Sequence, residues 1–107
     1  MIPFNDLVGT KLVADDGTYL GMISKNPYEG ESISNPYGSY GSPYSGTPIF
    51  NQYGSYGSPY SSFSPFNPYT STPPSIIKGK RKVGALTANS YLQNVVDVNQ
   101  FVSWLKR

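Results

Sequence analysis

The chain of 107 residues contains no cysteine and no histidine, and only 13% of its residues are charged. Without cysteine the protein has no disulfide and no thiolate nucleophile or ligand. Without histidine it lacks the commonest metal ligand and general base. No motif supports a catalytic Ser–Lys dyad or a catalytic pair of carboxylates. The sequence therefore predicts a protein that is not an enzyme and that has no cofactor or metal site.

Long hydrophobic runs are also missing. No stretch approaches the roughly 18 apolar residues that span a bilayer, so we expect no transmembrane segment. The first residues, MIPFNDLVGTKLV, lack the pattern of a signal peptide. We therefore expect a cytoplasmic location, either free or peripheral to a membrane. The net charge of +2 gives no reason to expect a nucleic-acid partner.

Glycine, proline, serine and tyrosine are abundant, and they are arranged in a repeat. Residues 35–50 and 51–66 match at 11 of 16 positions without a gap. A further copy opens at Asn67-Pro68-Tyr69, and a shortened one opens at Asn26-Pro27-Tyr28. A fixed period indicates one structural unit that recurs along the chain. The unit starts are Asn26, Asn35, Asn51 and Asn67, where asparagine favours turns because its side chain bonds to nearby main chain.

The length leaves room for one domain, in which we distinguish four parts. Residues 1–26 read as a hairpin with Asp15-Asp16-Gly17 at its turn, and residues 26–77 hold the four repeats. Residues 78–96 read as closing strands. Residues 97–107 read as a helix that Asp97 caps, with Val98, Phe101, Val102 and Leu105 on one face.

The two flanks of the repeats resemble each other. Residues 20–26, LGMISKN, match residues 83–89, VGALTAN, by residue type, with Gly21 and Gly84 at equivalent positions. Closed repeat folds bring their ends together to hide edge strands. We therefore expect the two segments to form the seam of a closed fold.

The paired YGSYGSPYS blocks and the VGALTAN segment resemble the four-fold β-flower family of small bacterial domains, over residues 16–89. This resemblance implies an all-β fold, a shallow closed barrel of short hairpin repeats with pseudo-four-fold symmetry. The expected fold is therefore this barrel followed by one C-terminal α-helix. The resemblance implies no reaction and no catalytic residue.

Two surfaces are candidates for function. Lys78, Lys80, Arg81 and Lys82 hold half of the eight basic residues. Such a run is ordinarily a solvated turn, but it also suits anionic lipid headgroups.

The second candidate is aromatic. The repeats hold eleven aromatic residues, and we expect most of their rings to fill the core and the others to edge the fold. As a candidate contact face we select Tyr37, Tyr40, Tyr44, Tyr53, Tyr56 and Tyr60.

The preferred function is a non-catalytic binding or scaffolding module, whose partner is another protein or a second copy. The alternative is a peripheral binder of anionic membrane lipid that uses residues 78–82 and the aromatic rim. A further alternative is an assembly-prone, disordered Tyr/Gly/Ser segment at residues 27–77. The strict period argues against disorder.

Overall fold

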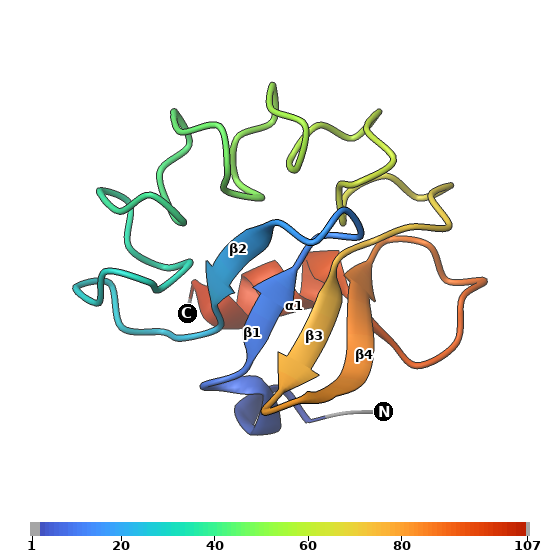
Figure 1. The fold of residues 1–107 in the computed structure, drawn as a ribbon, viewed down its shortest axis with the longest axis horizontal. Helices are drawn as coiled ribbons and strands as arrows, with labels where there is room; N and C mark the ends of the chain where they lie inside the picture. Colours follow the sequence, from blue (N-terminus) through green and yellow to red (C-terminus); the bar gives the residue numbers. More distant parts are fainter. Residues whose placement is uncertain (1–2, 107) are drawn as a thin grey trace.

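A computed structural model describes residues 3–106, and its regular structure is mainly one β-sheet with a helix at the C-terminal end (Figure 1). The five strands lie in the order β2-β1-β3-β4-β5. All neighbouring strands pair antiparallel except β4 and β5, which are parallel. The elements are the 3-10 helix η1 (Phe4–Leu7), β1 (Lys11–Val13), β2 (Tyr19–Met22), β3 (Ser75–Lys78), β4 (Arg81–Thr87), β5 (Val95–Asp97) and helix α1 (Val98–Leu105).

The β1–β2 hairpin turns where the sequence predicts it. Asp16 Oδ1 accepts a hydrogen bond of 3.0 Å from the Thr18 amide, and Gly17 has a φ of 90°. A positive φ is easy for glycine because it has no β-carbon. The β3–β4 hairpin turns at Gly79, whose φ is 66°, between the paired residues Lys78 and Arg81.

Helix α1 follows β5 directly, as the sequence predicts. The Asp97 side chain accepts a hydrogen bond of 2.9 Å from the Asn99 amide and so caps the helix. Val98, Phe101 and Leu105 are buried on the predicted apolar face. The predicted C-terminal helix is therefore confirmed, and it covers one side of the core.

The core combines side chains of the sheet, of α1 and of the repeats. Ile33 and Ile49, one repeat period apart, are fully buried, so each of these units contributes one aliphatic side chain to a common interior. The other members of this cluster are Leu7, Leu12, Ala14, Leu20, Ile23, Ile76, Leu86, Val96, Val98, Phe101 and Leu105.

The repeats form a chain of tight turns, which we call the turn arch (residues 26–74). It curves around the sheet in Figure 1. The turns are closed by main-chain hydrogen bonds that recur in successive units, such as Gly38 N–H to Asn35 O at 3.2 Å and Gly54 N–H to Asn51 O at 3.0 Å. Gly41 is required by close approach, because a β-carbon there would lie 2.0 Å from Asn35 O.

The expected closed barrel of hairpin repeats with four-fold symmetry is not supported. Within residues 3–106 the sheet stays open, with β2 and β5 at its edges. The units form turns instead of hairpins because prolines recur in them, and proline has no N–H for a strand ladder. The arch is bonded to the sheet near both of its ends: Met22 N–H of β2 donates to Glu31 O, and Ala88 N–H, just after β4, donates to Pro65 O.

The expectation that residues 20–26 and 83–89 form a seam is also wrong. Gly21 in β2 pairs with Leu12 of β1, and Gly84 in β4 pairs with Ile76 of β3. Two strands therefore separate the similar segments in the sheet. Their likeness reflects the same local turn, since in each a hydroxyl accepts from the amide of the asparagine two residues later, Ser24 at 3.1 Å and Thr87 at 2.9 Å.

Candidate functional site

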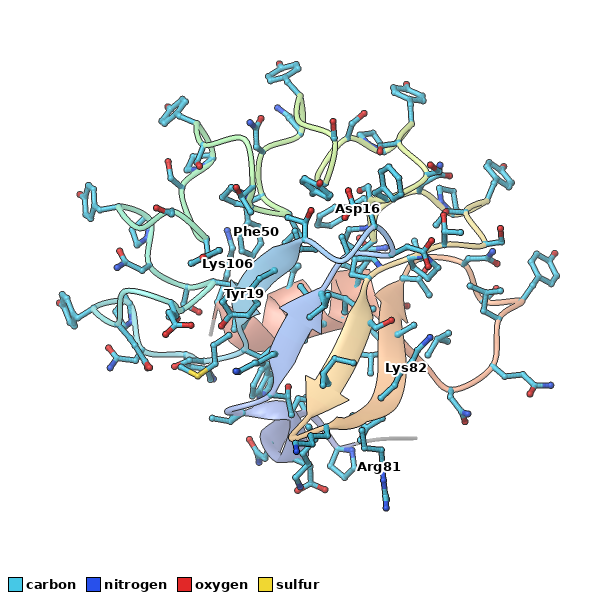
Figure 2. All side chains as sticks on the ribbon, viewed as in Figure 1. Asp16, Tyr19, Phe50, Arg81, Lys82 and Lys106 are labelled. Carbon is cyan, nitrogen blue, oxygen red and sulfur yellow. The ribbon has the colours of Figure 1, made fainter. Side chains whose placement is uncertain are left out.

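Most of the ten tyrosines lie outside the core. Seven of them are 87–96% exposed, far more than a large aromatic side chain usually is in a folded domain. Figure 2 shows aromatic rings that project outward from successive turns of the arch and from the loop after β4. We call this set the tyrosine rim, and its members are Tyr28, Tyr37, Tyr44, Tyr53, Tyr60, Tyr69 and Tyr91.

One local turn places every ring of the rim. In each case the tyrosine amide donates a hydrogen bond of 2.9–3.2 Å to the side chain two residues earlier. This acceptor is Asn Oδ1 in five turns and Ser Oγ in the turns at Ser42 and Ser58. Such a turn bends the chain within three residues. The tyrosine thus stands at the tip of the bend.

The asparagines also tie the rim turns together. The side-chain amide of Asn51 donates to Ser45 O at 2.7 Å, and that of Asn67 donates to Ser61 O at 3.2 Å. Asn35 makes the same contact with Glu29 O, and Asn89 with Thr70 O. Each of these side chains therefore caps its own turn and holds the preceding turn, so the spacing of the rings is built into the backbone.

The remaining tyrosines anchor the arch to the β1–β2 hairpin. Tyr56 donates from its hydroxyl to Asp16 Oδ2 at 2.7 Å, and Thr18 Oγ1 lies 3.0 Å from the same hydroxyl. Figure 2 shows Asp16 beneath the middle of the arch. The rings of Tyr19 and Tyr40 pack with 5.1 Å between their centroids.

These anchors shift two acid–base equilibria. The hydrogen bond from the Tyr56 hydroxyl, together with that from the Thr18 amide, lowers the pKa of Asp16 below its ordinary value. Burial raises the pKa of Tyr19, and the hydrogen bond of 2.8 Å to Glu31 acts in the same direction. Both groups are held by hydrogen bonds to side chains of the arch, Asp16 to Tyr56 and Tyr19 to Glu31, so we assign both a structural role.

The structure divides the predicted aromatic face. Tyr37, Tyr44, Tyr53 and Tyr60 belong to the rim, whereas Tyr40 and Tyr56 pack against the core. The expectation that most of the eleven aromatic rings of the repeats fill the core is wrong. Six of the eleven are rim tyrosines, and the five partly buried rings are those of Tyr40, Tyr56, Phe50, Phe63 and Phe66.

Sequence reasoning left Tyr28, Tyr69 and Tyr91 out of the candidate face. A signal for all three is present. Every rim tyrosine has Asn or Ser two residues before it, whereas Tyr19, Tyr40 and Tyr56 each have Gly there. The side chain of Asn or Ser accepts the tyrosine amide, which glycine cannot do.

The basic candidate lies elsewhere. Lys78, Lys80, Arg81 and Lys82 are all exposed at the β3–β4 hairpin turn. In Figure 2 Arg81 lies at the end of the sheet opposite the arch. Lys82 lies farther along β4 and lines a hollow with Gln93 and Asn94, in the loop that carries Tyr91, so only Arg81 is seen well apart from the rim.

Comparisons with known proteins identify no relative: no protein-family model, no curated protein and no solved structure matches the chain at a significant level. Within residues 3–106 no helix combines the length and the apolar composition that a membrane crossing needs.

Proposed function

We propose that the chain is a non-catalytic protein-binding module whose contact surface is the tyrosine rim. The observation that carries this proposal is the exposure of seven tyrosine rings, 87–96% each, in one repeated turn. Tyrosine is enriched in protein interfaces because it offers a large, amphipathic ring with few rotatable bonds. Rings this exposed contribute almost nothing to the core of the protein, so their role lies in contacts with another molecule.

The rim is arranged for binding at several points at once. The asparagine hydrogen bonds between neighbouring turns keep the rings at fixed positions along the arch. A preorganised surface loses little conformational entropy when a partner binds. Weak contacts of single rings therefore add up, because after the first contact the others form within one complex.

The charge distribution favours an uncharged partner surface. The 46 positions from Ser32 to Ile77 carry no charged side chain. Most of the rim therefore does not attract an acidic or a basic partner electrostatically. A second copy of the chain meets the same condition, because nothing in this stretch repels it. Self-association is thus one form that this protein–protein function takes.

A set of rim substitutions tests the proposal. Tyr37, Tyr44, Tyr53 and Tyr60 are changed together to Ser in one variant and to Phe in a matched control that keeps the rings. Sedimentation velocity over a concentration series measures self-association, and quantitative capture from cell extract compares partners retained by each protein. We expect the Ser variant to lose association or partners while its thermal melt stays unchanged. Equal behaviour of wild type and the folded Ser variant would refute a role of the rim.

The second candidate function is peripheral binding of anionic lipid, which the exposure of all four basic side chains at one hairpin turn favours. Each cation near an anionic membrane contributes about 1 kcal/mol. Because the turn lies opposite the arch, one flat membrane would touch the turn without most of the rim (Figure 2). Flotation with neutral and anionic vesicles at two salt concentrations tests this function. If binding persists when the four cations are changed to Ser, the basic turn is not the lipid-binding surface.

Membership of the four-fold β-flower family is a further proposal. The equivalent hydrogen bonding of the units that start at Asn35 and Asn51 supports a common repeat. An experimental structure tests it: a family member should show β2 joined by hydrogen bonds into a ring of four similar units, and an isolated β2 edge would count against membership.

A further inference from the structure

A cleft of about 540 Å³ lies where the first turns of the arch meet the end of α1. This volume is within the range of small-molecule sites. Its accessible apolar surface comes from Phe50 and from three prolines of the arch, Pro27, Pro36 and Pro43, while the buried side chains of Ile33 and Leu105 lie beneath it. Figure 2 shows Phe50 and Lys106 next to each other in this region.

Of the residues that the structure describes, two lysines, Lys25 and Lys106, are the charged ones that line the cleft. Lys25 Nζ lies 5.0 Å from the ring centroid of Trp104, and Lys106 Nζ lies 4.9 Å from that of Phe50. An aromatic face attracts a cation without neutralising it. Among residues 3–106 the cleft therefore combines an apolar wall with two positive charges, and no aspartate or glutamate lines it.

We propose that this cleft binds a linear carboxylate with an apolar chain, of the fatty-acid type. The chain would lie against Phe50 and the three prolines, and the carboxylate would lie between Lys25 and Lys106. Charge complementarity selects this ligand over an amine or a neutral alkyl chain, because an amine would meet two like charges. The apolar wall selects it over a small anion, since burial of each methylene contributes to binding. This site shares no residue with the tyrosine rim, so it does not depend on the function proposed for the rim.

The lone tryptophan provides a direct readout. Trp104 contacts Lys25, so a carboxylate that draws the lysine away changes the environment of the indole. Decanoate, titrated below its micelle concentration, should change the Trp104 emission saturably. Calorimetry of the same titration measures binding without a spectroscopic assumption. Acetate tests the head group alone, and decyltrimethylammonium tests the chain with the opposite charge.

A pair of double variants locates the site. Changing Lys25→Gln and Lys106→Gln should weaken decanoate binding by roughly 2- to 30-fold, as expected for the loss of two exposed ionic contacts. Changing Lys80→Gln and Lys82→Gln alters the net charge equally in the β3–β4 hairpin, whose residues do not line the cleft, and should leave binding unchanged. All four side chains are exposed, so both proteins should fold.

The proposal is overturned by three results: no saturable binding of decanoate, equal binding of acetate or of decyltrimethylammonium, or equal weakening by the two double variants. The rim substitutions described above leave both lysines in place. Failure of the cleft and failure of the rim are therefore measured separately.

Discussion

Replacement of Gly57 by alanine tests whether close packing of neighbouring turns holds the arch together. A β-carbon at Gly57 would lie 2.1 Å from Asn51 O and 2.6 Å from Ile49 O, whereas real β-carbons essentially never approach within 3.0 Å. Both neighbours are backbone atoms, so no side chain can swing aside. The turns must separate by roughly 1 Å, which the close packing of a protein interior does not absorb without loss.

The cost follows from the contacts near this point. The separation strains the hydrogen bond of 3.0 Å from Gly54 N–H to Asn51 O and the tie of 2.7 Å from Asn51 to Ser45 O. Each such bond contributes about 1 kcal/mol net, and overpacking adds about 1–3 kcal/mol. If both bonds are lost, we therefore expect Gly57→Ala to lower the free energy of unfolding by about 3–5 kcal/mol.

Gly46→Ala is the matched control in the same arch. A β-carbon there meets nothing within 4 Å, and its φ is not positive. We expect a change within about 0.5 kcal/mol, or a small gain, because alanine restricts the unfolded chain. Urea unfolding of the three proteins, followed by circular dichroism, measures the difference. If Gly57→Ala is as stable as Gly46→Ala, close packing of the Gly57 backbone against Asn51 and Ile49 does not hold the arch together.

Three further predictions concern the anchors and caps. Tyr56→Phe removes the hydrogen bond that lowers the Asp16 pKa; that stabilisation is complete above the unfolded pKa of about 4 and is lost as the pH falls below it. The difference in melting temperature between wild type and Tyr56→Phe should therefore shrink from pH 6 to pH 3, and a constant difference would contradict the assignment. Asn51→Asp removes the donor to the preceding turn and should cost about 1–3 kcal/mol in urea unfolding, whereas Gln52→Glu, which adds the same charge at an exposed position, should cost little. Asp97→Ala removes the cap of α1 and should cost about 1 kcal/mol; an unchanged unfolding midpoint would show that the cap is dispensable.

Local chemistry made several features predictable. The cap at Asp97 depends on an amide two residues away, and the turn at Asp16 depends on its neighbours Gly17 and Thr18. Such contacts lie within a few positions, so residue type and spacing suffice to predict them. The direction of the tyrosines belongs to the same class, because Asn or Ser two residues earlier separates the rim from Tyr40 and Tyr56.

Long-range packing was not predictable in the same way. Prolines in the repeats indicate turns, but they do not indicate whether those turns close a barrel or bridge an open sheet. Strand β1 pairs with β3, although one precedes the arch in the sequence and the other follows it. The contact of Tyr56 with Asp16 and the cleft between Lys25 and Lys106 arise in the same way.

The sequence by itself determined the period of the repeats, the turn at each unit start and the helix after Asp97. The outward direction of the rim tyrosines was not predicted, although its signal, Asn or Ser two residues earlier, is local. These features rest on interactions between residues that are close in the chain. Only the tertiary structure decided that the sheet stays open, that Arg81 lies at the end of the sheet opposite the arch, and that two lysines share an apolar cleft (Figures 1 and 2). Those features depend on which distant segments bury their apolar surfaces together, and the spacing of residues along the chain does not encode that choice directly.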